Sequence, residues 1–407
     1  MDNNGINDED EYRPGGCYHR LSIQLHSIDS LLLLLQVLKT VSGNNKDTTQ
    51  DASTILHIRA SNDDDEAASS SAGGAGAGLY IATESLSKTV IAGGFFPAQL
   101  CREFDLKAFT FNHRLGRLQE LPIQEFPAQF AIYASPLINA LQMFRTPTLL
   151  RLLYDSTPID LHDDNVEDDD DATLKLVIKD ESLGSVAECQ CIIHTLAINE
   201  DERIDASEVL EVLNDDDDLP SAKCDVLATE VLFAIGQELT LSPYLGIKSD
   251  IAQGAASSSS SVEANVSITS PSDTNIPALE IKATDWAAAD AAVVEVRLPY
   301  RPGVVDNIAI ANPTRRDSVS TTLPLPGLLC LLRSPCMKKH LRTTLWIHAT
   351  SHALSARWSI PDETSGRTSS LVAVKVSAVA DHHHRHTHDD SNNEHHPTRL
   401  NNRSRYH

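Results

Sequence analysis

The sequence predicts an α+β fold made of two similar halves, each with antiparallel strands and two short helices. Strand-like runs of alternating or β-branched residues fill both halves of the chain. Four short helical segments, rich in Leu or Ala, are centred roughly a hundred residues apart, a spacing that indicates a repeat. Because helices and strands do not alternate one by one, a parallel sheet of βαβ units is not indicated.

Strand patterns occur in both halves, where apolar residues recur at every second position or β-branched residues cluster. In the first half they cover Cys17–Leu25, Thr54–Ala60, Leu79–Thr83, Thr89–Phe95, Phe130–Ala134, Leu149–Tyr154, Leu174–Lys179 and Cys189–Leu196. In the second half they cover Ala264–Thr269, Ala278–Ala283, Val293–Leu298, Leu341–Ala349, Ala353–Ile360 and Leu371–Val379. Each half therefore has enough strands for more than one small sheet.

The four predicted helices are Ile28–Val41, Ser135–Phe144, Thr229–Leu239 and Pro326–Arg333. In the second of them, Ser135 is expected to cap the helix, with Pro136 at the first helical position. Apolar stripes at helical spacing are expected to seat the first two helices on a sheet: Leu31, Leu34, Leu35, Leu38, Leu137, Leu141 and Phe144.

Shifts in composition divide the chain. We expect a disordered tail at 1–15, a first domain at 16–196 with inserts at 61–77 and 162–172, and a connector at 197–221. A second domain follows at 222–380 with an insert at 252–262, and a disordered His-rich tail covers 381–407. The connector has apolar side chains that are expected to rest on a neighbouring sheet, namely Ile204, Val209, Leu210, Val212 and Leu213.

The charge of the chain is strongly acidic, with 57 acidic and 33 basic residues and a formal net charge of −24. Such a balance argues against a DNA partner, because phosphate binding requires Lys and Arg. Much of the excess stands in runs at Asp63–Glu66, Asp163–Asp171 and Asp215–Asp218. Runs of this kind are usually solvated loops, so net charge alone does not exclude DNA binding.

Motifs for metal binding and catalysis are missing from the sequence. Its seven cysteines form no CxxC pair, and GxSxG, P-loop GK[ST] and HExxH patterns do not occur. The tail from His382 to His396 is interpreted as solvated, although neutral imidazoles bind transition metals. No segment is apolar over the length of a membrane span, and the acidic start shows no signal-peptide pattern. We expect an intracellular protein with no catalytic residues, metal site or cofactor.

Several segments together resemble the subunits of the eukaryotic DNA sliding clamps. Gly78, Leu79, Ile81, Val90, Ala92 and Phe96 are similar to a hairpin of the first clamp domain. FAIYASPLINALQMF at 130–144 is similar to the second helix of that domain with the strand before it, and LLRLLYDSTPIDLH and LKLVIKDE resemble the strands behind it. In the second half, AKCDVLATEVLFAIGQEL and LPGLLCLLRSPCMKKHLRTTLWIHA match in outline. Within this proliferating-cell-nuclear-antigen-like superfamily, the chain looks closest to the Rad-one type subunit of the checkpoint clamp, the nine-one-one heterotrimer.

The resemblance implies a DNA-clamp fold, with antiparallel sheets outside and helices on a concave inner face. It implies a nuclear, non-enzymatic subunit that joins two other clamp subunits in a ring, is placed by a clamp loader and serves checkpoint and repair proteins. Basic residues on or next to the helices would contact duplex DNA without reading sequence: Lys39, Arg145, Lys223, Arg333, Lys338 and Lys339. Edge strands would join the subunits, here Glu188–Leu196 and Val293–Leu298, and the apolar connector residues would dock partners.

The sequence also allows simpler interpretations than a DNA clamp. The same Lys and Arg residues also suit helix C-terminal dipoles or a soluble surface. One alternative function is an acidic β-rich interaction module that does not encircle DNA. Another is a metal-dependent 3'-5' exonuclease, for which the sequence provides no defined set of separate carboxylates.

Overall fold

The chain is described from a computed structural model. The described residues are 17–41, 54–62, 76–85, 87–112, 117–121, 127–143, 149–156, 172–180, 187–199, 202–204, 206–211, 221–227, 229–241, 262–270, 276–285, 292–311, 318–334, 341–361 and 369–378. The two predicted tails and most of the three predicted inserts lie outside these ranges.

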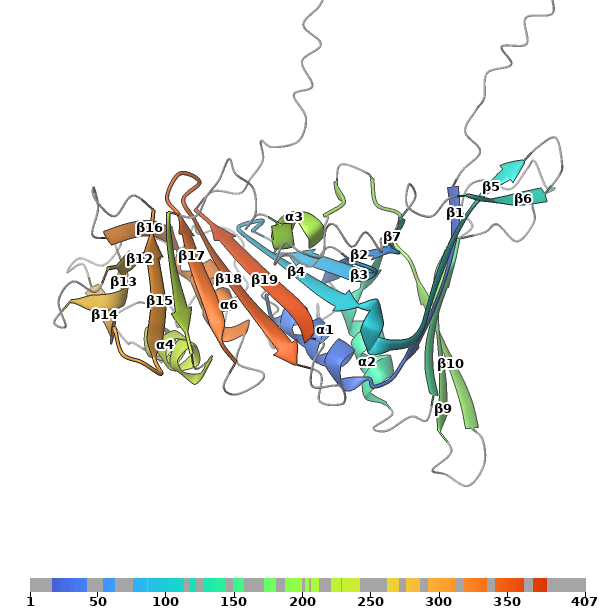
Figure 1. Cartoon of the computed structure of the whole chain (residues 1–407), viewed down its shortest axis with the longest axis horizontal. Helices are drawn as coiled ribbons and strands as arrows, with labels where there is room; N and C mark the ends of the chain where they lie inside the picture. The colour runs from blue at the N-terminus through green and yellow to red at the C-terminus, as the bar shows by residue number, and fades with distance from the viewer. Residues whose placement is uncertain are drawn as a thin grey trace, which may run out of the picture.

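Apart from η1 and β6, which occur in the first half alone among the described residues, the elements follow one another in the same order in both halves (Figure 1). The first half contains β1 (Cys17–Leu25), α1 (Asp29–Val41), β2 (Ile55–Ser61), β3 (Gly78–Glu84), β4 (Val90–Pro97), the 3-10 turn η1 (Ala98–Leu100), β5 (Cys101–Asn112), β6 (Arg117–Leu121), β7 (Ala128–Tyr133), α2 (Ala134–Gln142), β8 (Leu149–Asp155), β9 (Thr173–Asp180) and β10 (Ala187–His194). A short helix, α3 (Ala206–Glu211), lies in the connector.

The second half begins after the connector. It contains β11 (Ala222–Val226), α4 (Thr229–Leu241), β12 (Val262–Thr269), β13 (Pro277–Asp285), β14 (Ala292–Pro299), β15 (Val305–Ile310), β16 (Ser318–Pro324), α6 (Leu325–Arg333), β17 (Thr343–His348), β18 (Ala353–Pro361) and β19 (Ser369–Ser377). The α+β class is confirmed, since all the strand pairs of the described residues are antiparallel and the long helices come two to each half.

One pairing scheme is used twice. In the first half β1 lies between β5 and β8, while in the second half β11 lies between β15 and β17. Likewise β2 lies between β3 and β7, and β12 between β13 and β16. The ladders β3–β4 and β8–β9–β10 correspond to β13–β14 and β17–β18–β19. This matching confirms that the chain consists of two similar halves.

A pairing between β4 and β19 joins the halves into one nine-stranded sheet. Its strand order is β15-β11-β17-β18-β19-β4-β3-β2-β7. A six-stranded sheet, β10-β9-β8-β1-β5-β6, completes the first half, and a four-stranded sheet, β14-β13-β12-β16, completes the second. β10 and β14 therefore lie at opposite ends of the molecule (Figure 1).

The four long helices form a row on one side of the nine-stranded sheet. α1 contacts β3, β4, β18 and β19, and α6 contacts β19, β12 and β16. α1 also contacts α2 and α6, and α6 contacts α4, so the order of the row is α2-α1-α6-α4 (Figure 1). Leu31, Leu34, Leu35 and Leu38 of α1 are buried in the main core, as the apolar stripe predicted.

Two adjacent glycines in β4 let helices approach the sheet from both faces. A Cβ on Gly94 would lie 2.5 Å from Cδ1 of Leu34 in α1. A Cβ on Gly93 would lie 3.0 Å from Cβ of Val209 in α3. Since successive side chains of a strand point to opposite faces, α1 and the connector helix α3 cover β4 from opposite sides.

Some sequence-based expectations differ from the structure. α2 begins at Ala134 after Tyr133, without a side-chain cap, so Ser135 lies inside the first turn and the capping prediction was wrong. The strands β5, β6, β11, β15 and β16 were not predicted. β5 contains several charged residues that face solvent beside β1 and β8, where Glu103 lies 3.6 Å from Arg151 and Asp105 lies 3.8 Å from Lys107. Such a strand lacks the dense run of apolar residues by which a strand is predicted from sequence.

Candidate functional site

The solvent side of the helical row has few charges. Within the described residues of the four helices, the basic side chains are Lys39 and Arg333, and the acidic ones are Asp29, Glu230 and Glu238. Other exposed side chains of the row are uncharged, among them Asn139, Gln142, Ala234, Gln237 and Pro326. The described row therefore has no surplus of positive charge.

Lys39 and Arg333 lie at the C-terminal ends of neighbouring helices. Lys39 is half-buried in the last turn of α1. Arg333 ends α6, and its Nη2 donates a hydrogen bond of 2.6 Å to Oγ1 of Thr240 in α4. Arg333 therefore links two helices of the row, and cations at helix C-termini are also favoured by the helix dipole.

Lys223 is directed away from the helical row. Its neighbours Ala222 and Cys224 are buried in the core, where β11 contacts α4. Strand alternation places Lys223 on the opposite face, and its Nζ lies 5.8 Å from the centroid of the Trp346 ring on β17. We therefore leave Lys223 out of the DNA-facing residues considered below. Arg145, Lys338 and Lys339 lie outside the described residues.

A buried carboxylate anchors β11 on the same face as Lys223. Asp225 is 3% exposed and forms an ion pair with Arg342. It accepts hydrogen bonds from Oγ1 of Thr344 at 2.7 Å and from Nδ2 of Asn307 at 2.9 Å. Burial raises the pKa of Asp225, but the hydrogen bonds from Thr344, Arg342 and Asn307 outweigh it, so its pKa lies below the ordinary value. This network holds β11, β15 and β17 together.

The segments expected to join subunits, Glu188–Leu196 and Val293–Leu298, fall on the strands β10 and β14, and their contact with other subunits stays a prediction. β10 ends the six-stranded sheet, and β14 ends the four-stranded sheet. Each presents an exposed apolar side chain, Ile192 with 59% and Val293 with 48% of its surface exposed. Ion pairs flank these positions, with Glu188 3.0 Å from Lys179 and Arg297 3.3 Å from Glu280.

In the repeat, β10 and β14 are the equivalents of β19 and β4, the two strands that join the halves. Tyr133 and Pro324 each stand directly before a helix, so they are equivalent positions in the two halves. When the strand pairings are traced outward from these two residues, Val293 of β14 occupies the position that Ile91 has in β4. Aligning the buried positions of β1 and β11 in the same way makes Ile192 of β10 equivalent to Lys375 of β19. Ile91 and Lys375 lie directly opposite each other in the β4–β19 pair.

The connector rests on the face of the sheet opposite the helical row. In α3, Val209 and Leu210 are buried against a cluster that includes Tyr80, Phe95 and Ala373, and Ile204 packs beside it. The expectation that these three connector residues rest on the sheet is thereby confirmed. Val212 and Leu213 lie outside the described residues. The docking of partners on the connector stays a prediction.

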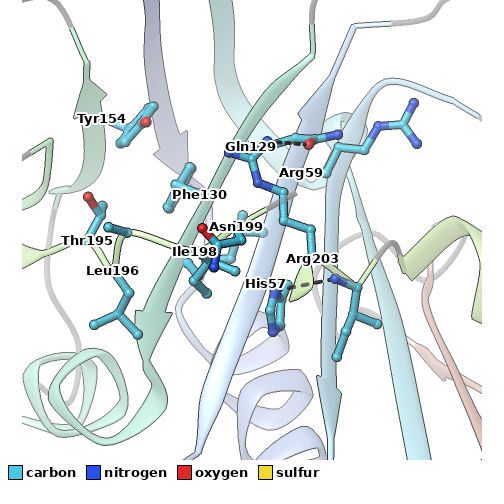
Figure 2. A pocket seen from close by; sticks show the side chains of 14 residues that line it. His57, Arg59, Gln129, Phe130, Tyr154, Thr195, Leu196, Ile198, Asn199 and Arg203 are labelled. Atoms are coloured by element: carbon cyan, nitrogen blue, oxygen red, sulfur yellow. Dashed lines mark hydrogen bonds between the residues drawn. The ribbon is translucent and has the colours of Figure 1, made fainter. Parts of the chain in front are cut away.

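A cavity of about 450 Å³ lies where the connector begins, on the outer side of β2 and β7 (Figure 2). His57, Arg59, Gln129 and Arg203 line it together with the aromatic pair Phe130 and Tyr154. None of these residues was singled out from the sequence. The signal available was the alternation in β2, where Leu56 and Ile58 are buried and the intervening His57 and Arg59 must face the other way.

The described part of the chain also bears on metal binding and on membrane insertion. There, no group of three or more His, Cys, Asp or Glu side chains is arranged to hold a metal ion. No helix among the described residues has the length and apolar character needed to cross a membrane.

Comparisons with known proteins give structural matches only. No protein-family model matches the sequence, and no curated protein matches it. The chain is similar to a crystal structure of proliferating cellular nuclear antigen (PCNA) from Entamoeba histolytica, with a TM-score of 0.48 and 9% identity over 88% of this chain and 98% of that one. A PCNA2–PCNA3 complex from Sulfolobus tokodaii matches with a TM-score of 0.48 and 10% identity, over 88% of this chain and 100% of that one. PCNA from Thermococcus kodakaraensis matches with a TM-score of 0.48 and 11% identity, over 88% and 99%. Likeness at this level supports no inference about function.

Proposed function

We propose that this chain is a non-enzymatic subunit of a ring-shaped clamp that encircles duplex DNA without reading its sequence. The observation that supports the proposal most directly is the repeat of strand pairings, in which β4 and β19 join the halves while their equivalents β14 and β10 end their sheets. Each half thus has one edge of each kind. Inside the chain, β4 of the first half pairs with β19 of the second half. The equivalent strands, β14 and β10, are left at the ends of their sheets.

Repetition of the internal junction gives an assembly. If β10 and β14 each pair with a neighbouring subunit as β19 pairs with β4, the subunits associate head to tail. Head-to-tail contacts generate rings when the rotation closes and filaments when it does not. The register of the internal junction then places Ile192 and Val293 at the new contacts, where their exposed apolar surface is removed from water.

In such a ring the helical row faces the DNA. Lys39 and Arg333 are the described basic residues that we propose for phosphate contacts. Arg145, Lys338 and Lys339, which follow α2 and α6 in the sequence, complete the proposed set. A row with so few charges suits retention by encirclement, in which the duplex is held topologically and contact affinity contributes little.

The finer form of the proposal follows the resemblance in the sequence. The chain would be the Rad-one type subunit of a nuclear checkpoint clamp, joined to two different clamp subunits and placed on DNA by a clamp loader. Checkpoint and repair proteins would dock on the connector through Ile204, Val209, Leu210, Val212 and Leu213. The register above also sets Glu188 of one copy opposite Arg297 of a second copy, so self-association has to be tested as well.

The assembly test uses the full chain, alone and mixed with two candidate clamp subunits, in size-exclusion chromatography with light scattering. A complex with one copy of each subunit supports the heterotrimer. A homotrimer of the chain alone contradicts the heterotrimeric form but keeps the clamp. A chain that stays monomeric in every mixture contradicts the clamp.

The DNA test compares retention of the loaded ring on circular and linearised plasmid. We expect retention on circular DNA and loss on linear DNA, since a ring slides off free ends. Charge reversal at Arg333 should lower retention and reduce the slope of log K against log salt by about 0.9 for each lost phosphate contact. Arg117→Glu on β6, in the six-stranded sheet, is the matched control and should change neither.

A second candidate function is an acidic interaction module that does not encircle DNA. The observation in its favour is the lack of positive surplus on the described helical row, with two basic and three acidic side chains. If the assembled ring dissociates from circular plasmid as fast as from linear plasmid, it does not encircle DNA, and this second function is the one supported.

A further inference from the structure

The described residues that line the cavity at the start of the connector carry charge of one sign only. Its lining residues include Arg59, Arg203 and His57, and none of those described is Asp or Glu. This is unusual for a chain with a net charge of −24. Concave surfaces lined by one sign of charge raise the local concentration of ligands of opposite sign, so the cavity favours an anion.

The basic groups are held in place by neighbours from three segments. Arg59 of β2 lies directly opposite Gln129 of β7 in the strand register, and its guanidinium carbon lies 5.7 Å from the Tyr80 ring centroid. Nη1 of Arg203 donates a hydrogen bond of 3.3 Å to Oε1 of Gln129, drawn dashed in Figure 2. Arg59 and Arg203 therefore both lie beside Gln129 of β7.

His57 connects the strand to the connector backbone. Its Nδ1 accepts a hydrogen bond of 3.4 Å from the backbone N–H of Ile204, the second dashed line in Figure 2. With Nδ1 as acceptor, the proton of the neutral ring is on Nε2, which is then a donor. The hydrogen bond fixes the His57 ring between β2 and the connector at the wall of the cavity.

Two largely buried aromatic rings line the cavity beside the charged groups. The rings of Phe130 and Tyr154 are stacked with centroids 4.1 Å apart and planes 15° apart. Leu196, at the end of the first domain, and Ile198, at the start of the connector, also line the cavity (Figure 2). A ligand for this cavity thus needs an apolar part beside its negative charge, which a free inorganic ion does not have.

The geometry of β7 favours an extended peptide. β7 is the last strand of the nine-stranded sheet, and among the described residues its outer edge pairs only through the isolated bridge between Ala131 and Leu196. Segments that lie along a strand edge gain backbone hydrogen bonds and place alternate side chains into flanking pockets. The cavity volume also lies within the usual range for small ligand sites, about 300–1,000 Å³.

We propose that this cavity binds an acidic segment of a partner protein that also contains an aromatic or large apolar residue. Its carboxylates would pair with Arg59 and Arg203, and its apolar side chain would pack on Phe130 and Tyr154. The site lies on the face of the sheet opposite the helical row, so duplex DNA beside those helices does not reach it. The proposal rests on the partner docking proposed above, since Ile204 of the connector also lines the cavity, and it does not depend on ring assembly.

The test begins with the isolated full chain and a phage-displayed library of random 12-residue peptides. Panning is counter-selected against the double variant Arg59→Gln, Arg203→Gln. We expect enriched peptides that combine Asp or Glu with Phe, Tyr, Trp or Leu. The strongest such peptide, fluorescein-labelled, is then the probe in anisotropy titrations.

In those titrations Arg203→Gln and Arg59→Gln should each weaken binding by about tenfold or more, because each removes one ion pair with the peptide. Arg203 is exposed, so its variant keeps the test valid even if Arg59→Gln disturbs the fold beside Tyr80. Arg117→Gln on β6 removes the same charge in another sheet and should leave binding unchanged.

Four outcomes would overturn the proposal. The first is no enrichment over the double variant, and the second is enrichment of peptides without acidic residues. The third is inorganic phosphate binding more tightly than the selected peptide, which would assign the cavity to a small anion. The fourth is binding that appears only after deletion of residues 162–172, which would assign it to the chain's own acidic segment.

Discussion

β4 and β14 occupy the same place in the two halves of the molecule and have opposite surroundings. β4 is buried along nearly its whole length between β3 and β19. β14 pairs only with β13 among the described strands, and every second side chain is exposed. Where β4 has Gly93 and Gly94, the equivalent positions of β14 are Glu295 and Val296.

The difference shows how equivalent strands are built differently at a junction inside the chain and at the open edge of a sheet. At β4 the glycines remove side chains, so α1 and α3 close over both faces and fix the two halves together. At β14 charged side chains form ion pairs on the surface, as Arg297 does with Glu280 and Glu295. Charged groups at a strand edge limit unwanted pairing and leave the edge soluble until a fitting partner arrives.

Gly94→Val makes β4 resemble β14 and should have the largest effect on the isolated chain. The new Cβ would lie 2.5 Å from Cδ1 of Leu34, which is fully buried. We expect a loss of about 3 kcal/mol in the free energy of unfolding, measured with urea. Val296→Ala on β14 is the control and should change the value by less than about 0.5 kcal/mol. Equal losses at the two sites would show that the junction is not specially packed.

Asp225→Ala tests the second half by itself. It leaves Thr344, Asn307 and Arg342 without their shared acceptor, and we expect a loss of about 2 kcal/mol at neutral pH. Because the pKa of Asp225 is lowered on folding, its contribution is present above its ordinary, unfolded pKa and is lost as the pH falls through the folded value.

Urea midpoints of wild type and Asp225→Asn at neutral and acidic pH check this sign. The difference in urea midpoint between wild type and Asp225→Asn should become smaller as the pH is lowered. Asp105→Ala, which removes an exposed carboxylate from β5, should cost less than about 0.5 kcal/mol at either pH. A gap that widens on acidification would contradict the assigned network.

Gly93→Ala should have a smaller effect, confined to the connector. Its Cβ would lie 3.0 Å from Cβ of Val209 and 3.1 Å from the backbone oxygen of Ala206, so α3 must move outward. We expect a loss of about 1 kcal/mol and faster cleavage of the connector in limited proteolysis. The double variant Gly93→Ala, Val209→Ala should be destabilised by less than the sum of the two single variants, because the smaller side chain makes room for the new Cβ. If the two effects simply add, residue 93 does not contact Val209.

Ile192→Glu and Val293→Glu should change the stability of the isolated chain by less than about 0.5 kcal/mol, because both side chains are exposed. They should weaken subunit association by about tenfold or more, since each puts a charge into an apolar contact. Sedimentation at several concentrations measures the change. Ser320→Glu on β16, at the other edge of the sheet that contains β14, is the control. Unaltered association in both edge variants would remove β10 and β14 from the interface.

Local patterns in the sequence predicted the two-half plan, the four long helices and β1 with its observed bounds. They missed β11, whose Lys223 and Asp225 break the apolar run. This strand forms because β15 and β17 flank it and Asp225 finds three partners, which are tertiary effects. The cavity was missed for a related reason, since the hydrogen bond from Ile204 to His57 joins residues far apart in the chain. Lys223 was expected beside DNA from its nearness to α4 in sequence, but strand alternation directs it to the opposite face.

The β4–β19 pair also has a consequence for biosynthesis. Phe95 of β4 emerges from the ribosome long before its partner Leu371 has been synthesised. Until then the apolar strand β4 has an open edge, which is the kind of surface on which nascent chains aggregate. Pairing over such a separation is slow because the loop must close before the contact forms. Completion of the last strand is therefore the step at which translation rate and chaperone supply are expected to limit the yield of folded protein.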